Sequence, residues 1–462
     1  MELIPEVQDV FEIFSSHGYE INLVGGCIRN FLLSKPIKDY DMCTNASPEE
    51  VIALFSRTLP LGIDYGTVHV FVNGKEFEIT TYRKEGNYID HRRPDKVVFV
   101  EDIKTDLARR DFTINAMAYN EKDGIIDLFH GRKDIENKII RTVGDPNVRF
   151  QEDAIRMLRA IRFACTLDFT IEEDTLKAIQ ENKEELLKIS CDRIRLELNQ
   201  IILSNHIEKG IDYLKSTGIW DIIFQKYLQH ILQEPLLKNL DTFALLSEEE
   251  KLKYFFVILF YNDQEVEKRI ILASHFFAEY NYPKSIVKDV LEIMKQIALL
   301  PLDLNEYDGK FVCRLIKKLQ NVFDIFLNCG KEIFANTSKQ FIFDTIEKYY
   351  CKLDKENMIK SRNELAVHGK DLLEIGFPHN SAISIALDEL VELVMENPSL
   401  NEREYLLEYL KNKGIESFIQ RDRYFQTKNN AKERLKTEVI LHKRLQDENE
   451  DLEERLKQLI KE

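Results

Sequence analysis

The apolar residues of this chain change their spacing once, close to residues 144–146, and this change limits the folds open to it. Before it, short apolar or alternating runs are separated by glycine turns, as expected of strands mixed with helices. From about Asp153 onward, apolar residues recur at helical spacing almost without interruption, as at Ile155 and Leu158. The sequence therefore predicts an α+β fold, in which a small mixed head precedes a long all-α part.

Within the first 130 residues, four segments have patterns that predict a structure. Residues 21–26 (INLVGG) predict a buried strand that ends in a glycine turn, and residues 28–34 predict a short helix. Residues 38–42 (KDYDM) predict a second strand. Residues 67–83 predict a hairpin around Asn73-Gly74, a dipeptide that favours the tight turn between two strands.

Spacing and composition together divide the chain into five expected parts. They are a head over residues 1–140, a helical neck over 141–205, a helical body over 206–355, a helical tail over 356–430 and a terminal helix over 431–462.

The terminal helix has the spacing of a heptad repeat with one polar interruption. The positions that carry it are Leu445, Asn449, Leu452, Leu456 and Leu459. Two interpretations remain open: a solvated helix that packs on its own domain, and a homodimer formed through this helix.

The net charge of −16 argues only weakly against a nucleic-acid partner, because phosphate binding depends on local charge rather than on the total. Residues 130–163 carry eight Lys and Arg side chains against five Asp and Glu. The seven cysteines are dispersed, which argues against a zinc or disulfide framework. The sequence has no apolar run of bilayer length and no basic segment before an apolar core, so we expect a cytoplasmic protein without a membrane partner.

The sharpest local feature is the acidic pair Asp39 and Asp41, which follows a Gly-Gly turn. On a strand, residues i and i+2 point to the same face, so both carboxylates can reach one Mg²⁺ ion. Nucleotide polymerisation needs this arrangement, because one metal activates the attacking 3′-hydroxyl and a second neutralises the triphosphate. A solvated surface pair is the alternative for an isolated Asp-x-Asp. The glycines and Arg29 ahead of the pair favour the metal site.

Two further features extend this candidate site. The glycine pair that ends in Gly26 lets backbone N–H groups approach a phosphate at a helix start, with Arg29 one turn into the helix. A third carboxylate can come from the hairpin, where Glu76 and Glu78 share a face. Glu78 is the better candidate, because a stretch expected of a core-facing strand follows it. An ordinary exposed strand glutamate remains the alternative.

Several blocks of this sequence resemble, in the same order, the signatures of the tRNA nucleotidyltransferase and bacterial poly(A) polymerase family, and within it the bacterial CCA-adding type. In the first half they are GGCIRNFLL, KDYDM, RRDFTINAMAYN (109–120), DLFHGRKD (127–134) and EDAIRMLRAIRFA (152–164). Further along they are CDRIRLELNQIIL (191–203), VHGKDLLEIG (367–376) and NEREYLLEYL (401–410).

The resemblance implies a DNA polymerase β-like head with Mg²⁺ on Asp39 and Asp41. It further implies a set of nucleotide-binding residues, namely Gly26, Arg29, Arg110, Asp153, Arg156, Arg159 and Arg162. In this family Asp usually follows the arginine of the first block. Here that residue is Asn30, which we interpret as a helix-start or orienting residue.

The chemistry of Asp153 and Arg156 fits the base-reading role that the resemblance implies. At i and i+3 on one helix they project from the same face. An ionised Asp only accepts hydrogen bonds and an Arg only donates them. Cytosine and adenine both offer a donor beside an acceptor, whereas uracil and guanine present the opposite order. A surface salt-bridge ladder is the alternative for these charges.

The resemblance therefore implies an enzyme that adds CTP- and ATP-derived nucleotides to the tRNA 3′ end without a template, with Mg²⁺ as cofactor. The basic segment 82–99 predicts a loop before a strand, either a surface loop or one that repositions the pocket between C and A addition. The alternatives are an A-adding or CC-adding tRNA nucleotidyltransferase, a poly(A) polymerase, and a non-catalytic RNA-binding protein. The helical stretch 254–270 has no His-Asp pair, so we expect no second phosphohydrolase activity.

Overall fold

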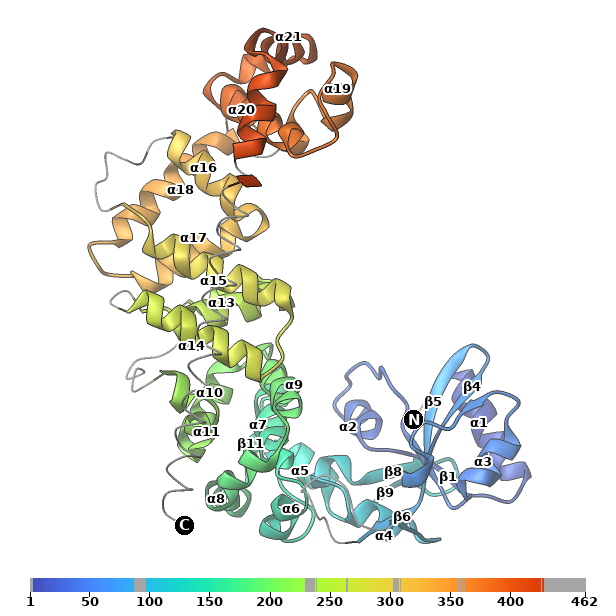
Figure 1. The fold of residues 1–462 in the computed structure, drawn as a ribbon. Coiled ribbons are helices and arrows are strands. Elements are labelled where there is room, and N and C mark those ends of the chain that lie inside the picture. The colour runs from blue at the N-terminus through green and yellow to red at the C-terminus, as the bar shows by residue number, and fades with distance from the viewer. Residues whose placement is uncertain are drawn as a thin grey trace, which may run out of the picture. The chain divides into compact units, whose positions relative to one another are not determined.

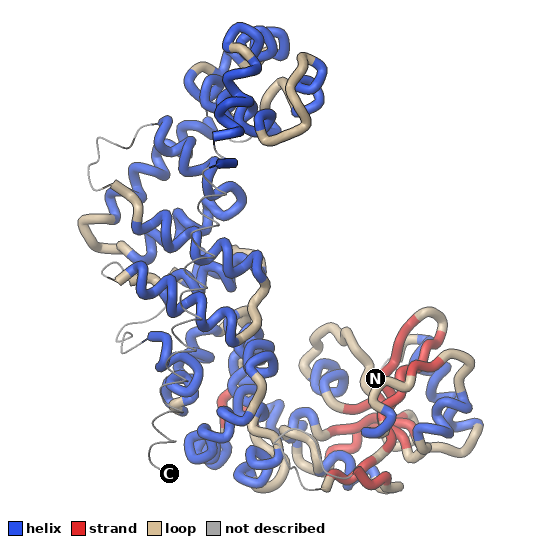
Figure 2. Tube along the Cα trace, in the orientation of Figure 1, coloured by secondary structure: helices blue, strands red, loops and turns tan. Residues whose placement is uncertain are grey.

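The computed structural model describes residues 3–86, 97–228, 239–262, 265–301, 309–355 and 362–427, except residue 425, together with residues 237, 307 and 359. The chain divides into two compact units, Met1–Ala298 and Leu299–Glu462. In the described part of the chain, every strand belongs to the first unit, and the named elements of the second unit are helices (Figure 1, Figure 2). The predicted α+β fold is confirmed.

The described head contains a seven-stranded mixed sheet with the order β3-β4-β5-β2-β1-β8-β9. Its strands are β1 (Ile21–Val24), β2 (Met42–Thr44), β3 (Thr58–Leu59), β4 (Thr67–Val72), β5 (Lys75–Thr81), β8 (Met117–Asn120) and β9 (Gly124–Asp127). Strands β2 and β5 run parallel, and the other neighbours are antiparallel. Two small ribbons pair β6 (Arg83–Glu85) with β7 (Val97–Phe99), and β10 (Ile139–Ile140) with β11 (Thr170–Ile171).

Three of the predicted head elements are confirmed. Strand β1 is buried at all four positions and leads through Gly25, at φ +74°, into α2 (Gly26–Leu32). The hairpin joins β4 to β5 through Asn73 and Gly74, both at positive φ, as the tight hairpin turn requires. The predicted second strand was misplaced, because β2 begins at Met42 and the acidic pair lies just before it, in a segment without regular secondary structure.

Besides α2, the described head contains further α-helices. They are α1 (Pro5–Ser16), α3 (Pro48–Leu54), α4 (Ile103–Ala108) and α5 (Gly131–Glu136). Helices α1 and α3 pack on β4, and α2 packs on β1 and β8. Leu107 of α4 belongs to a core cluster with Val24 and Cys43 of the sheet, which sets the position of the chain that follows α4. The chain after Asp111 forms only the short 3₁₀ helix η2 (Thr113–Asn115).

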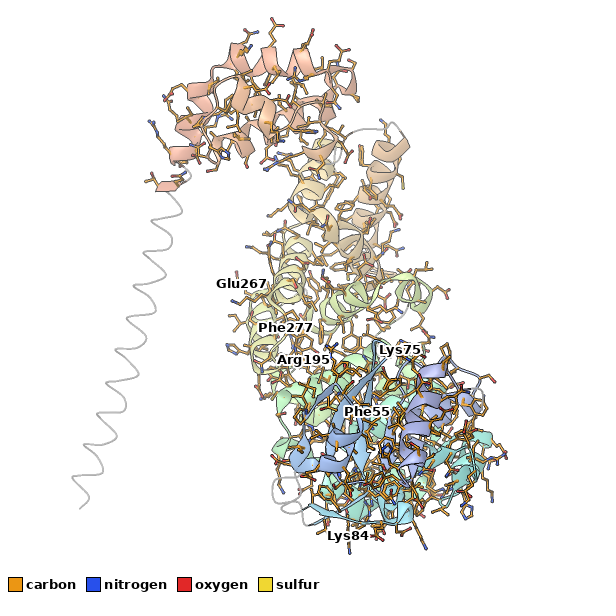
Figure 3. The ribbon with its side chains drawn as sticks, turned by 90° about the vertical axis from the view of Figure 1, so that its right-hand side faces the viewer. Phe55, Lys75, Lys84, Arg195, Glu267 and Phe277 are labelled. Carbon is orange, nitrogen blue, oxygen red and sulfur yellow. The ribbon has the colours of Figure 1, made fainter. Side chains whose placement is uncertain are left out.

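The helical part of the first unit begins at α6. Its helices are α6 (Pro146–Glu152), α7 (Ile155–Leu167), α8 (Glu173–Asn182), α9 (Cys191–Ile202), α10 (Ile207–Thr217), α11 (Ile219–Leu228), α12 (Leu240–Leu245), α13 (Glu248–Phe260), α14 (Val266–Glu279) and α15 (Lys284–Ala298). Helix α7 packs along α9. Helices α13 and α14 meet in a buried aromatic cluster around Phe256 and Phe276, next to Phe277, which Figure 3 labels.

The second unit carries α16 (Gly309–Leu319), α17 (Phe323–Ile333), α18 (Gln340–Lys355), α19 (Gly369–Glu374), α20 (Ala382–Glu396) and α21 (Arg403–Lys413). The division at Ala298 falls within the range predicted for the body, and the predicted domain boundaries stay predictions. The terminal helix over 431–462 lies outside the described residues, so the homodimer also stays a prediction. No helix that the structure describes has the length and apolar character needed to cross a membrane.

Candidate active site

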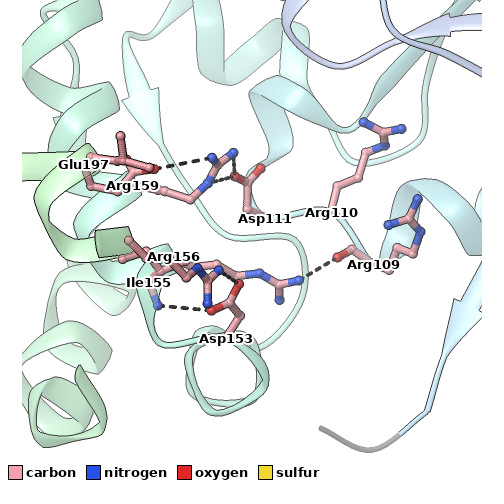
Figure 4. A pocket seen from close by; sticks show the side chains of 10 residues that line it. Arg109, Arg110, Asp111, Asp153, Ile155, Arg156, Arg159 and Glu197 are labelled. Atoms are coloured by element: carbon pink, nitrogen blue, oxygen red, sulfur yellow. Dashed lines mark hydrogen bonds and ion pairs between the residues drawn. The ribbon is translucent and has the colours of Figure 1, made fainter. Parts of the chain in front are cut away.

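A pocket of about 450 Å³ lies where the head meets α7 and α9 (Figure 4). Its lining combines arginines with a smaller number of carboxylates and two aliphatic side chains. These residues are Arg109, Arg110, Asp111, Asp153, Ile155, Arg156, Arg159, Arg193, Leu196 and Glu197. The excess of positive charge suits an anionic ligand such as a nucleotide. Of the predicted nucleotide-binding residues, Arg110, Asp153, Arg156 and Arg159 come together here.

Asp153 and Arg156 line the same pocket, but they do not project from one continuous helix as predicted. Helix α6 ends at Glu152, and Asp153 has an extended backbone at φ −146° and ψ 101° before α7 begins at Ile155. Asp153 Oδ1 accepts the backbone N–H of Ile155 at 3.4 Å, at the start of α7 (Figure 4). The prediction that both side chains project from one face of a single helix is therefore wrong. The two side chains reach the pocket from a helix junction and from the first turn of α7.

Both groups have partners within the protein. Arg193 of α9 donates from Nη2 to Asp153 Oδ2 at 2.7 Å. Arg156 is buried, and its Nη1 donates to Glu152 Oε2 at 2.6 Å. Its Nη2 donates to the backbone carbonyl of Arg109 at 3.2 Å, which ties the base of the pocket to the head (Figure 4). These contacts fix the directions of one acceptor and one donor at the pocket wall.

Arg159 pairs across the pocket with two carboxylates. It donates from Nε and Nη2 to Asp111 Oδ2 at 2.8 and 2.6 Å, and its Nη1 lies 3.8 Å from Glu197 Oε1. Burial alone would raise the pKa of Asp111, but the charge and hydrogen bond of Arg159 outweigh burial and lower it to about 2. Asp111 is therefore ionised at neutral pH and fixes Arg159 against the head.

Arg29 and Arg162 lie beside the pocket rather than in its lining. Arg29 of α2 donates from Nη1 to Asn115 Oδ1 at 2.7 Å, and its guanidinium carbon lies 5.1 Å from the centre of the Phe163 ring. Arg162 lies 4.3 Å from the same ring centre, and its Nε is 3.1 Å from Glu197 Oε2. Burial lowers the pKa of Arg29 to about 10. Both guanidinium groups thus lie against the same aromatic ring, that of Phe163 on α7.

Asn30, where the sequence departs from the family pattern, contacts Arg29 directly. Its Oδ1 accepts hydrogen bonds from Arg29 Nε at 3.2 Å and Nη2 at 3.0 Å. Its Nδ2 donates to the carbonyl of Pro36 at 3.3 Å. These contacts are those of a residue that orients Arg29.

The strand register brings together two of the three predicted carboxylates. Met42 of β2 pairs in parallel with Ile79 of β5. Asp41 and Glu78 immediately precede these residues, so they occupy neighbouring positions on one face of the sheet. Loss of hydration raises the pKa of Asp41, and the charges of Glu78 and Asp39 raise it further, against the opposing charge of Arg110. The three carboxylates therefore act on one another at the exposed end of the sheet.

Gly25 lies where Arg110 and Asp41 approach each other. A Cβ atom on Gly25 would lie 3.1 Å from Arg110 Nη1 and 3.9 Å from Asp41 Oδ2. A Cβ on Gly26 would meet only Arg29 Nη2, at 3.5 Å. Position 25 is therefore the one that requires glycine, because it combines a positive φ with this close approach. Arg110 Nε is buried and has no hydrogen-bond partner among the described residues.

The donor set of Asp39, Asp41 and Glu78 fits a divalent cation that arrives with a phosphate ligand. Within the described ranges, no three Asp, Glu, His or Cys side chains converge closely enough to hold a metal ion by themselves. Mg²⁺ commonly takes one or two carboxylates and completes its shell with waters and substrate phosphates. Burial and, after it, the charges of Glu78 and Asp39 raise the pKa of Asp41, and a bound cation would offset both.

Sequence reasoning missed three residues that the geometry brings into this site: Asp111, Arg193 and Glu197. Asp111 follows Arg110, which the resemblance had singled out, so its place beside a candidate arginine was the available signal. Arg193 and Glu197 lie on α9, about 40 residues beyond their partners, and no local pattern identifies such a pairing.

Two family models match the chain. Residues 21–141 match the poly A polymerase head domain, and residues 168–231 match a probable RNA and SrmB-binding site of polymerase A.

Similar proteins cover most of the chain. The CCA-adding enzyme of Ligilactobacillus salivarius is 34% identical over 411 residues, which span 87% of this chain and 95% of that protein. The CCA-adding enzyme of Oceanobacillus iheyensis is 48% identical over 199 residues, which span 43% of this chain and 50% of that protein. The crystal structure of the Bacillus stearothermophilus CCA-adding enzyme in complex with CTP has a TM-score of 0.61 and 28% identity, and covers 92% of this chain and 100% of that one.

Proposed function

Because this chain belongs to the CCA-adding enzyme family of nucleotidyltransferases, we propose that it adds nucleotides from CTP and ATP to the tRNA 3′ end, without a template and with Mg²⁺. In this reaction the terminal 3′-oxygen of the RNA forms a bond to the α-phosphorus as the bond to pyrophosphate breaks.

The observation that carries the proposal is the position of Arg110. It lines the pocket that holds Asp153 and Arg156, and its Nη1 also lies against Gly25 close to Asp41. One side chain therefore lines the pocket and also approaches the carboxylate centre. A nucleoside triphosphate has this same layout, with a base at one end and a charged triphosphate at the other. Arg110 is suited to bind the triphosphate between them.

At the carboxylate centre, Asp39 and Asp41 would hold Mg²⁺, and Glu78 adds negative charge beside them. Bound Mg²⁺ would supply activation of the 3′-hydroxyl and neutralisation of the triphosphate. Arg29, anchored by Asn115 and Asn30, adds positive charge at the start of α2.

At the pocket, Asp153 would accept the exocyclic amino group of cytosine or adenine, and Arg156 would donate to the neighbouring ring nitrogen. Uracil and guanine present an acceptor to Asp153 and a donor to Arg156. This mismatch costs about 1–3 kcal/mol for each hydrogen bond that is not made. Arg159 and Arg162 support this wall through Asp111 and Glu197. The protein itself then selects the nucleotide, so no template strand is needed.

The same geometry is compatible with an enzyme that adds only A or only CC, and with a poly(A) polymerase. We favour complete CCA addition, because the Ligilactobacillus salivarius and Bacillus stearothermophilus proteins are both CCA-adding enzymes and match along most of this chain. We also propose a cytoplasmic location, because the substrate of such an enzyme is tRNA.

Incorporation assays on defined RNA ends test the proposal. The full chain is incubated with Mg²⁺ and single nucleotides on tRNA lacking CCA, on tRNA ending in CC, and on oligo(A). We expect C then C then A on the first substrate, A on the second, and no extension of oligo(A). Unlimited A addition to oligo(A) would overturn the tRNA assignment. Incorporation that persists in EDTA would overturn the proposed requirement for Mg²⁺.

A further inference from the structure

Asp106 is a fully buried carboxylate on which two arginines of the pocket lining converge. It lies on α4, and its side chain has no exposed surface. Arg109 donates from Nε to Asp106 Oδ1 at 2.9 Å, and its Nη2 lies 2.8 Å from the same oxygen. Arg110 donates from Nη2 to the other oxygen, Oδ2, at 3.4 Å. Each carboxylate oxygen thus holds one guanidinium.

The charge on Asp106 is maintained by these two arginines and by the backbone N–H of Arg83, which donates to Oδ1 at 3.4 Å. Burial opposes ionisation, but the charges of Arg109 and Arg110 and the hydrogen bond of Arg109 outweigh it, so the pKa of Asp106 lies below its ordinary value. A buried charge is tolerated only when such partners compensate it. The Asp106 carboxylate has no exposed surface and therefore little freedom to move. It acts as a fixed anchor for the two guanidinium groups that bind it.

Both arginines connect Asp106 to the two halves of the proposed nucleotide site. Arg110 Nη1 lies at Gly25 beside Asp41, where the triphosphate is expected. The backbone carbonyl of Arg109 accepts a hydrogen bond from the base-reading Arg156 at 3.2 Å. Asp106 itself does not line the pocket. It can therefore influence a nucleotide only through the residues that it holds.

We propose that Asp106 is a positioning residue for nucleotide binding, which fixes the Arg110 guanidinium toward the triphosphate and the Arg109 backbone beneath Arg156. The proposal rests on the proposed function of the site. It assigns to Asp106 a role in nucleoside-triphosphate affinity rather than in the chemical step or in tRNA binding.

The test compares the full-length Asp106→Asn variant with wild type. Asparagine keeps the shape of the side chain, but its amide N–H₂ faces a guanidinium that also only donates, so one arginine loses its partner. We expect the KM for CTP and ATP to rise at least about tenfold, with the KM for tRNA within about twofold of wild type. CTP binding measured calorimetrically without tRNA weakens by the same factor. An unchanged CTP affinity in a folded Asp106→Asn variant would overturn the proposal.

A double-mutant cycle with Arg110→Met separates positioning from general destabilisation. If Asp106 acts through Arg110, adding Asp106→Asn to Arg110→Met lowers CTP affinity much less than it does in the wild-type background. Additive effects in the cycle would contradict the proposal, even where the single variant is less stable.

The matched control is Asp422→Asn in the second unit, which alters another buried carboxylate that binds Ser381 and Gln426. It should leave CTP affinity unchanged. Failure of the proposed function itself would be seen separately, as absence of CTP binding and incorporation in the wild-type protein.

Discussion

Arg159 places its guanidinium against one carboxylate oxygen of Asp111, with Nε at 2.8 Å and Nη2 at 2.6 Å from Oδ2. Asp111 precedes η2 in the head, and Arg159 lies on α7, so this contact joins elements that are 48 residues apart in sequence. The pair fixes α7 to the head at the pocket that also contains Arg156.

The Asp111→Asn variant should lose stability in a pH-dependent manner. The folded pKa of Asp111, about 2, lies below the ordinary value of 3.8, so its ionic contribution is fully present above about pH 4 and is lost as pH falls toward 2. Wild type should exceed the variant by about 2 kcal/mol in unfolding free energy near pH 5. Urea unfolding between pH 3 and pH 6 measures this difference. A gap that stays constant over that range would contradict the ionic assignment.

Replacing Gly25 by Ala should reduce nucleotide affinity as well as stability. The added Cβ would lie 3.1 Å from Arg110 Nη1 and would require an unfavourable positive φ. We expect kcat/KM for CTP to fall about tenfold or more as Arg110 is displaced. Gly74→Ala is the control, because Gly74 also has positive φ but no atom within 4 Å of the added Cβ. It should lose stability alone, and equal losses of kcat/KM in both variants would count against the role of Arg110.

Glu78→Gln should impair catalysis, whereas Glu76→Gln should not. Both residues lie on the same face of β5, but Glu78 acts electrostatically on Asp41, while Glu76 lies 2.7 Å from Nδ1 of His69. Loss of the Glu78 charge should lower kcat for CTP incorporation on the order of a hundredfold, through weaker stabilisation of the metal-bound transition state. Single-turnover incorporation at saturating CTP measures the effect. If both variants kept wild-type rates, Glu78 would not be the third carboxylate.

Asp153→Asn should relax the choice of nucleotide. An ionised Asp only accepts hydrogen bonds, whereas an Asn amide also donates and so tolerates the carbonyl of uracil or guanine. We expect discrimination against UTP and GTP to fall about tenfold, as measured by the ratio of kcat/KM values for the four nucleotides. Asp168→Asn, at the opposite end of α7 and paired with Lys209, should retain wild-type selectivity. Undiminished discrimination in Asp153→Asn would exclude Asp153 as the base-reading acceptor.

Much of the head was predictable, because its signals are local. The apolar run before Gly25 and the Asn73-Gly74 turn determine strand, turn and hairpin within a few residues, and the structure has them there. The start of β2 was misplaced, because nothing in residues 38–42 marks which of them pair with β5. That choice is made by the neighbouring strands.

The site was less predictable, because its contacts join distant segments. The sequence around Asp153 and Ala154 contains neither Gly nor Pro, and its spacing is that of an unbroken helix. The junction between α6 and α7 instead depends on a hydrogen bond to the Ile155 backbone and on the ion pair with Arg193, 40 residues away. No sequence period encodes such a contact. Residue types were therefore predictable, and their partners were not.

The partners of Asp153 and Arg156 have a consequence for how a nucleotide enters. Both side chains are already engaged, by Arg193 and by Glu152 respectively, so a base that binds them competes with an internal ligand. An incoming nucleotide must then replace or share these contacts. Uracil or guanine cannot form the hydrogen bonds that would replace them. If this pocket selects the base as proposed, selection is a competition between the base and the protein's own ion pairs.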